Sequence, residues 1–168
     1  MKKSFLYTIL GIFVFTISIL TFLLNFRPHT PQLEKYLFHP NLDYNIGSLN
    51  VKFLGNTNIL ITDGKTSILT DGFFSRPSIS NVLWGEIEPD YGVIEYCLEK
   101  AGIHQLNAVI PVHSHFDHAM DSPIVAMKTG AKLIGSESTA NIGRGLNFPE
   151  DQMVIVKSGV PLQIGSMK

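Results

Sequence analysis

The sequence predicts an α/β (α+β) protein in which short strands come first and strands alternating with helices follow. Between Gly47 and Asp71, three aliphatic or β-branched runs are separated by turn residues, a pattern typical of antiparallel strands. Beyond Asp90, segments of helix length alternate with segments of strand length. The 168 residues, net charge of -1 and 45% hydrophobic content fit one globular domain and not a disordered chain.

The segment from residue 5 to 26, FLYTILGIFVFTISILTFLLNF, contains no charged residue. A helix of that length is roughly 33 Å long, enough to cross a hydrocarbon core of about 30 Å. A cleaved signal peptide usually has a shorter apolar region that ends at a small-residue cleavage site. A buried core helix is also disfavoured, because this segment is apolar on every face and lies at the chain terminus. We therefore expect residues 1–26 to be an uncleaved transmembrane anchor.

The charges that flank this segment predict its orientation in the membrane. Lys2 and Lys3 precede it, whereas only Arg27 and Lys35 follow it closely. Because positive charge is retained on the cytoplasmic side, the N-terminus is predicted to be cytoplasmic. The domain that follows would then lie on the outer face of the cell membrane, on a single-pass anchor.

Residues 27–46 contain three prolines and no sustained hydrophobic period. This composition predicts an extended linker that joins the anchor to the domain. His29 and His39 lie in this segment, where isolated histidines are usually solvated, and we assign them no role. The domain is expected to occupy residues 47–168.

The first half of the domain predicts a β-meander followed by a helix. The runs SLNVKFL, TNILIT and SILTD would be its strands, with a tight turn at Asp63-Gly64 because both residues tolerate positive φ. The next stretch, residues 72–90, is rich in Pro, Gly and Ser and is expected to be irregular. Asp90 is expected to cap a helix, YGVIEYCLEKA, which stops at the following glycine.

The second half predicts strands that alternate with a helix. The run LNAVIPVH, residues 106–113, predicts a strand, although Pro111 would interrupt its hydrogen bonds. Ser122 and Pro123 predict the start of a short helix that ends near Gly130. AKLIG is expected to be a further strand, and MVIVK and PLQIG a second hairpin about the Ser-Gly pair between them.

The stretch HSHFDHAMD, residues 113–121, holds three of the six histidines of the chain. Side chains alternate along a strand, so His113 and His115 are predicted to share one face. Asp117 and His118 would then be presented from the turn that follows. Imidazoles and carboxylates are ligands of zinc, and two metal ions that share a hydroxide can attack an electrophilic carbon or phosphorus. The stretch therefore predicts a hydrolytic metal site.

The motif H-x-H-x-D-H after an apolar strand resembles the metallo-β-lactamase superfamily, and VKFLGNTNILITDGKTSILTDGFFSRP is similar to its opening hairpins. The resemblance covers about residues 47–168 and implies an αββα sandwich. It implies that His113 and His115 bind a first zinc ion and that Asp117 and His118 bind a second. Asp117 would also orient or deprotonate the attacking water. Manganese or iron could replace zinc, because these ligands accept several divalent ions.

Four further residues have open or simpler interpretations. Asp71 stands where the superfamily often keeps an aspartate, but a strand-end aspartate also commonly bonds to turn amides. Asp121 would either accept an imidazole N–H or cap the helix that follows. Arg76 would either meet an anionic substrate or be solvated. Cys97 is the sole cysteine, so it forms no intrachain disulfide and is expected to pack as a small buried hydrophobe.

The superfamily completes its site with two more histidines and a bridging aspartate, but this sequence has no histidine after His118 and no aspartate after Asp151. We therefore expect the chain to be the N-terminal part of a longer enzyme, with half of the sandwich and little activity of its own.

Two functional hypotheses follow from the sequence. The first is a membrane-anchored zinc hydrolase of an ester, lactone or phosphodiester, with a small-molecule or lipid-like substrate. The alternative is a non-catalytic anchored protein that binds a metal or a partner. Nucleic acid is not an expected partner, because the sequence has no basic tract that would meet phosphates.

Overall fold

The computed structural model describes residues 2–25 and 49–167, which belong to two compact units that we describe separately. The predicted linker, residues 27–46, lies outside the described residues together with His29 and His39.

The described part of the first unit is one helix, α1 (Lys2–Asn25), which covers the segment predicted to be the anchor. Its span Lys3–Leu23 is long and apolar enough to cross a membrane. The hydroxyl groups on α1 donate to carbonyl oxygens four residues earlier at 2.8–3.0 Å, as shown by Thr8, Thr16 and Ser18. Such internal bonds satisfy polar side chains that would otherwise be unpaired in hydrocarbon.

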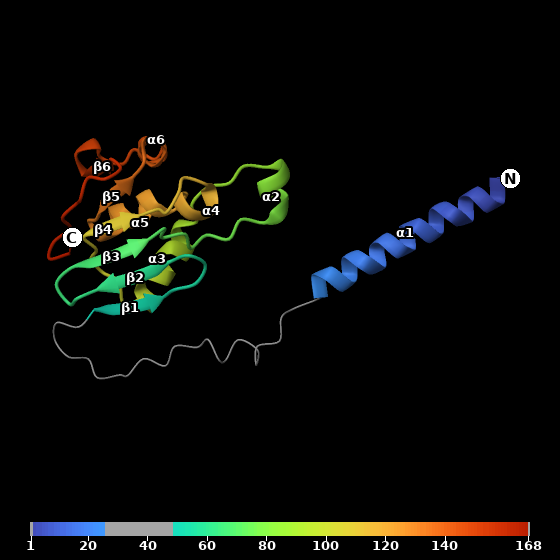
Figure 1. Cartoon of the computed structure of the whole chain (residues 1–168), viewed down its shortest axis with the longest axis horizontal. Coiled ribbons are helices and arrows are strands. Elements are labelled where there is room, and N and C mark those ends of the chain that lie inside the picture. The colour runs from blue at the N-terminus through green and yellow to red at the C-terminus, as the bar shows by residue number, and fades with distance from the viewer. Residues whose placement is uncertain (1, 26–48, 168) are drawn as a thin grey trace. The chain divides into compact units, whose positions relative to one another are not determined.

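The second unit contains one six-stranded mixed sheet in the order β1-β2-β3-β4-β5-β6 (Figure 1). The strands are β1 (Asn50–Phe53), β2 (Ile59–Thr62), β3 (Ser67–Thr70), β4 (Ala108–Ile110), β5 (Lys132–Gly135) and β6 (Met153–Ile155). β1, β2 and β3 pair antiparallel, whereas β3, β4, β5 and β6 pair parallel. The predicted meander and the strands that follow it are therefore confirmed as one α/β sheet.

The turn between β2 and β3 forms at the predicted position. The Asp63 carboxylate accepts the backbone N–H groups of Lys65 at 2.8 Å and Thr66 at 2.7 Å. Gly64 between them has φ +86°, a conformation that glycine adopts at no steric cost.

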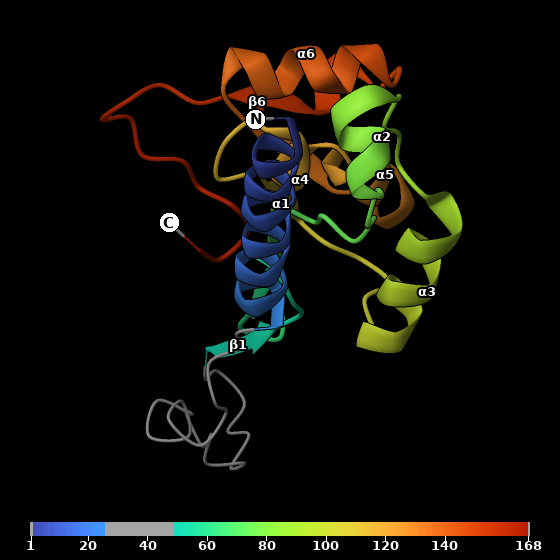
Figure 2. The same cartoon turned by 90° about the vertical axis from the view of Figure 1, so that its right-hand side faces the viewer.

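Helices cover one face of this sheet. They include α3 (Tyr91–Ala101), α5 (Ser122–Thr129) and α6 (Glu137–Gly145). The strands β3 to β6 follow one another across the sheet in chain order. Right-handed crossovers between them therefore place the intervening helices on the same face of the sheet. Figure 2 shows α3 and α5 on one side of the sheet, and the segment after β6 on the other. The described domain thus consists of one mixed sheet with these helices on one face.

The core lies between the sheet and these helices. Its central side chains come from the inner face of the sheet and from α3 and α5, and they are Leu69, Ile94, Leu98, Val109, Ile124, Val125 and Leu133. Full burial of one such aliphatic side chain is worth about 1.5–3 kcal/mol, so this layer contact is the main source of stability.

The helix caps agree with the sequence for α3 and reveal a helix that the sequence did not predict. The Asp90 carboxylate accepts the Val93 N–H at 3.0 Å, and Gly102 ends α3 with φ +71°. The unpredicted helix α6 begins where the Ser136 hydroxyl accepts the Thr139 N–H. Its sequence, ESTANIGRG, has few apolar residues and two glycines, which are weak helix formers, so the sequence does not predict a helix there.

The strand before the histidine cluster is shorter than predicted. β4 ends at Ile110, because Pro111 has no N–H to donate to the sheet. His113 and His115 therefore lie in the loop that follows, and the prediction that they alternate along a strand is wrong.

Two other predicted features are also wrong. MVIVK and PLQIG do not form a hairpin, since β6 pairs parallel with β5 and residues 161–165 are not a strand of the sheet. Instead the C-terminal segment returns to the β2–β3 turn, where Ser166 bonds to Asp63 and Thr66. The stretch expected to be irregular contains a short helix, α2 (Ile79–Trp84).

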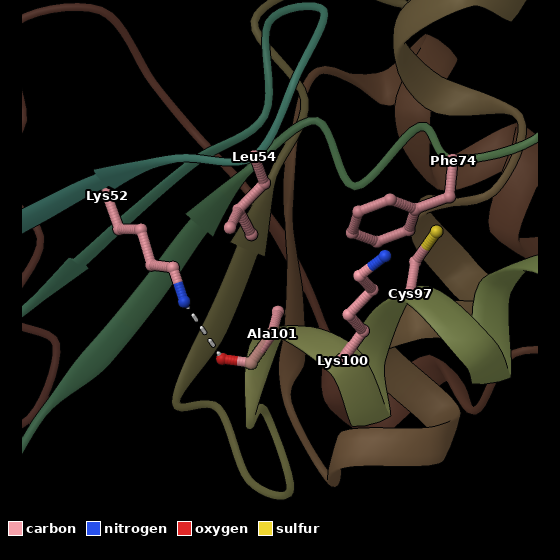
Figure 3. A pocket seen from close by; sticks show the side chains of 6 residues that line it. All are labelled: Lys52, Leu54, Phe74, Cys97, Lys100 and Ala101. Carbon is pink, nitrogen blue, oxygen red and sulfur yellow. Dashed lines mark hydrogen bonds between the residues drawn. The ribbon is translucent and has the colours of Figure 1, made fainter.

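A pocket of about 240 Å³ lies between the edge strand β1 and helix α3 (Figure 3). Leu54, Phe74 and Ala101 line it with Cys97, Lys52 and Lys100. Cys97 is thus half-buried and packs against the core, with its sulfur beside this pocket and not sealed in the interior. The Lys52 ammonium donates to the Ala101 carbonyl at 3.3 Å and so ties β1 to the end of α3.

Candidate metal centre

The histidine cluster lies at the edge of the sheet where the parallel strands β3 and β4 end. Asp71 follows β3 directly, and His113 and His115 follow β4. The carboxyl ends of neighbouring parallel strands emerge at the same edge, which is the usual place for a site in an α/β sheet. The one-turn helix α4 (Phe116–Ala119) then adds Asp117 and His118.

Three of the four predicted metal ligands come together. His113, Asp117 and His118 each offer one ligand atom, and these atoms all lie within 4.8 Å of one another. The Nε2 atom of His118 is 3.9 Å from an Asp117 carboxylate oxygen, and the His113 and His118 ring centroids are 4.0 Å apart. Two imidazoles and a carboxylate at such distances suit one divalent ion.

His115 borders this group without joining it. Its ring lies edge-on to that of His113, with the centroids 4.7 Å apart. His115 precedes α4 at the N-cap position, where its side chain makes no capping hydrogen bond. The structure therefore leaves its imidazole exposed next to the three ligands.

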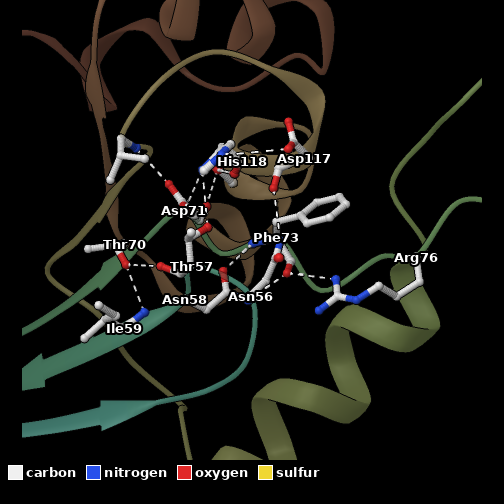
Figure 4. Close-up of polar contacts among 12 residues, drawn as sticks. Asn56, Thr57, Asn58, Ile59, Thr70, Asp71, Phe73, Arg76, Asp117 and His118 are labelled. Carbon is white, nitrogen blue, oxygen red and sulfur yellow. Dashed lines mark hydrogen bonds and ion pairs between the residues drawn. The ribbon is translucent and has the colours of Figure 1, made fainter. Parts of the chain in front are cut away.

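Asp71 orients the His118 ring. One of its carboxylate oxygens is 2.8 Å from Nδ1 of His118, and the Thr57 hydroxyl is 3.2 Å from the same nitrogen (Figure 4). A carboxylate oxygen only accepts, so the bond to Asp71 requires the proton on Nδ1 and leaves the lone pair on Nε2. An arrangement of this kind fixes a ligand histidine in the tautomer that binds metal and raises its basicity.

Asp71 is itself held from three directions. Its second carboxylate oxygen accepts the Val112 N–H at 2.8 Å, and its carbonyl accepts the hydroxyl of Ser122. The side chain is fully buried, and φ is +53°, a conformation that aspartate adopts more readily than most residues. The sequence suggested that Asp71 bonds to amides of a nearby turn. The amide that it accepts belongs instead to a loop 41 residues further along the chain, and the bond to His118 was not predicted.

Asp121 has neither of the roles expected for it. It precedes α5, but its side chain makes no capping bond and does not contact an imidazole nitrogen in the described hydrogen bonds. Instead one oxygen accepts the N–H groups of Phe74 at 2.8 Å and Ser75 at 2.6 Å. The other oxygen is buried without a partner, and burial raises the pKa of the carboxyl. Asp121 thus holds the segment that leaves β3.

Arg76 supports the same segment. Its guanidinium donates to the carbonyls of Ser75 at 2.7 Å and Phe73 at 3.2 Å and stands 5.1 Å from the Phe73 ring centroid. The Phe73 ring in turn meets Phe116 edge-on, with centroids 6.3 Å apart. Arg76 therefore links this segment to the start of α4.

Three residues at the rim of the site were not predicted. Asn56 donates to the Asp117 carbonyl at 3.3 Å, and Thr57 contacts His118. Asn58 is fully buried and exchanges two hydrogen bonds with the backbone of Phe73, at 2.7 and 2.8 Å. The only sign of these residues in the sequence is the polar run GNTN between two strands. Nothing in the local sequence shows that this turn contacts residues 61 positions further along the chain.

The chain is similar in sequence to proteins named UPF0173 metal-dependent hydrolase. That of Heliobacterium modesticaldum is 29% identical over 93 residues, which cover 55% of this chain and 32% of the relative. That of Myxococcus xanthus is 39% identical over 59 residues, covering 35% and 20%, and that of Symbiobacterium thermophilum is 28% identical over 88 residues, covering 52% and 32%. The chain thus spans about a third or less of these curated relatives.

Among solved structures, the chain is similar to Igni18, described as a novel metallo hydrolase from the archaeon Ignicoccus hospitalis. The TM-score is 0.45 at 16% identity, with 68% of this chain and 42% of that chain covered. No family model matches the chain.

The class to which the site and the relatives point is that of metal-dependent hydrolases with a mixed α/β sheet. These relatives support the resemblance of the chain to the metallo-β-lactamase superfamily, to which the UPF0173 proteins belong.

Proposed function

We propose that the chain carries the metal-binding site of a membrane-anchored, metal-dependent hydrolase. The observation that carries this proposal is the convergence of His113, Asp117 and His118, with His118 already oriented by Asp71. A ring that is oriented before the ion arrives loses little conformational freedom on binding, and this small entropic cost supports metal binding by the group. Zinc is the ion that two imidazoles and a carboxylate suit best.

The ligands and their neighbours would divide the work between them. His113 and His118 would hold the ion through their nitrogens, and Asp71 would keep the His118 tautomer correct. Asp117, whose side chain is 50% exposed, would bind through one carboxylate oxygen and accept the proton of the attacking water. When bound, the ion would supply Lewis-acid polarisation and a water that ionises near neutral pH.

The proposed substrate has an ester, lactone or phosphodiester bond and is a small molecule or lipid-like. A metal-activated water attacks all three bonds by the same chemistry. A lipid-like substrate is favoured by the candidate membrane span Lys3–Leu23, because an anchored site meets lipids at high local concentration.

One observation favours a second candidate, a non-catalytic anchored protein that binds metal. Within the described part of the chain, the group at this site comprises only three ligand residues, with His115 beside it. Three ligands suffice for one ion, whereas a pair of ions needs more.

The experiment is metal titration and hydrolysis by the full chain in detergent, compared with His118→Ala. The control is His104→Ala, which removes an exposed histidine outside the cluster. We expect stoichiometric zinc in the wild type and in the control, loss of zinc in His118→Ala, and weak zinc-dependent cleavage in a panel of esters, lactones and phosphodiesters. Zinc binding without cleavage would support the second candidate, and equal zinc content in all three chains would exclude both.

A further inference from the structure

The short helix α2 presents apolar side chains to solvent. Ile79, Leu83 and Trp84 are 78%, 60% and 88% exposed, and no residue of the helix is buried. Ile79 and Leu83 are four residues apart, so they lie on the same face of the helix. A surface helix normally turns its apolar face to the core, whereas α2 leaves its apolar side chains exposed.

Asn81 is the one residue of α2 that lines a pocket of the domain. Asn81 lines a pocket of about 480 Å³ together with Arg76, Glu88 and Asp90. The helix is fixed at both ends, since the Ser78 hydroxyl accepts the Asn81 N–H at 3.2 Å and the Asn81 carbonyl accepts the Gly85 N–H at 3.0 Å. The exposed apolar side chains therefore belong to a helix whose two ends are held by hydrogen bonds.

The segment that carries α2 begins at the rim of the candidate metal centre. Phe73, at its base, contacts Phe116, the residue before the ligand Asp117. Figure 1 shows α2 at the end of two extended stretches of chain, away from the sheet, and Figure 4 shows the Arg76 guanidinium near Phe73 at the base of this segment. The base of the segment that carries α2 therefore borders the metal centre, while α2 itself projects from the domain.

We infer that α2 docks into the surface of a zwitterionic lipid bilayer, an inference that rests on the membrane anchor of the proposed function. The chain carries its own candidate span, and residues 26–48, even fully extended, reach no more than about 80 Å beyond it. The bilayer is therefore always close to the domain. Tryptophan with aliphatic neighbours is the composition that settles at a membrane interface.

The charges around α2 decide which lipid surface fits. Residues 77–90 contain no lysine or arginine, whereas Glu86, Glu88 and Asp90 follow the helix. Attraction to anionic lipids is thus absent, and the contact is apolar.

Trp84 tests this directly, because it is the only tryptophan in the chain. In the full chain in phosphatidylcholine vesicles, we expect its emission to shift to shorter wavelength, brominated acyl chains to quench it and iodide not to reach it, at low and high salt alike. The double variant Ile79→Ser/Leu83→Ser should lose the bromolipid quenching. Val160→Ser, which replaces an equally exposed apolar residue of the C-terminal segment, should retain it.

Flotation of the same vesicles separates the outcomes. A chain that floats while Trp84 remains accessible to iodide overturns the α2 inference and leaves the anchor intact. A shifted emission that brominated lipid does not quench also overturns it, because protein, such as a second copy, then covers α2. A chain that does not float overturns the inference and the anchor together, while its zinc content still tests the metal centre.

Discussion

At the scale of residues, two buried aspartates do different work. Asp71 holds a metal-ligand histidine, whereas Asp121 holds the backbone of Phe74 and Ser75. Each has two oxygens in the interior, and a buried carboxylate is stable only when hydrogen-bond donors surround it. Asp71 has a donor on each oxygen, but one oxygen of Asp121 has none. The first therefore orients a candidate metal ligand, and the second is a support that costs some stability.

Asp71→Asn should lower zinc affinity about 10- to 100-fold without unfolding the chain. Asparagine has one acceptor oxygen, so it cannot accept both the Val112 N–H and the His118 Nδ1–H that Asp71 now accepts. Competitive titration with a zinc chelator measures the affinity, and circular dichroism checks the fold. A variant that is folded and binds zinc as tightly as the wild type would contradict the positioning role.

Asp121→Asn should change how stability depends on pH. Burial raises the pKa of Asp121 above its ordinary 3.8, so the folded chain holds this proton to higher pH than the unfolded chain. Stability of the wild type relative to the variant should therefore fall as pH rises from 3.8 through the raised pKa. Urea unfolding of both chains across this range measures it, and a difference that does not vary with pH would exclude this role.

At the scale of elements, the helices that position the site are defined by their ends. α3 starts at the Asp90 cap and ends in a pair of bonds, from Gly102 N–H to the Glu99 carbonyl and from Ile103 N–H to the Leu98 carbonyl. This arrangement requires positive φ at the residue after the helix. Ile103 is then buried, so the helix end also directs the chain back to β4.

Gly102→Ala should destabilise the second unit by about 1 kcal/mol, because alanine resists the φ of +71° that ends α3. A Cβ at this position would meet nothing within 4 Å, so no steric clash contributes. Gly145→Ala is the matched control, since its Cβ also has free space and its φ is not positive. Urea unfolding should show a loss for Gly102→Ala alone, and an equal loss in both variants would refute the backbone explanation.

At the scale of the whole molecule, the chain combines an apolar helix with a sheet that is covered by helices on one face. The helix exposes all of its described side chains, as an element made for lipid would. The domain places its candidate metal ligands at the carboxyl ends of β3 and β4. The candidate membrane span and the candidate metal centre thus lie in different units of the chain, and each can be tested separately.

The full chain should remain in the membrane fraction after an alkaline carbonate wash, whereas a chain lacking residues 2–25 should be released. The physical reason is the length and apolar character of Lys3–Leu23, whose removal from lipid would expose its side chains to water. Zinc content should be the same in both chains, because the ligands all belong to the second unit. Release of the full chain by the wash would rule out a spanning anchor.

Much of this protein could be predicted from local sequence patterns. The apolar run predicted α1, alternating runs predicted β1 to β3, and Asp90 with a later glycine set the ends of α3. Such features depend on residues close in sequence, where propensity and spacing carry the information. The density of His and Asp after β4 likewise identified the candidate ligands before any fold was known.

The tertiary structure determined the contacts between residues that are far apart in the sequence. Asp71 and His118 are 47 positions apart, and only the parallel pairing of β3 with β4 brings them within 2.8 Å. The same pairing makes Asp121 a support for Phe74 and Ser75, a role that its place before a helix does not suggest. The sequence by itself determined which residues can bind a metal and which segment can enter a membrane. The arrangement of the strands determined which ligands meet, because distances across a sheet depend on strand order and not on local pattern.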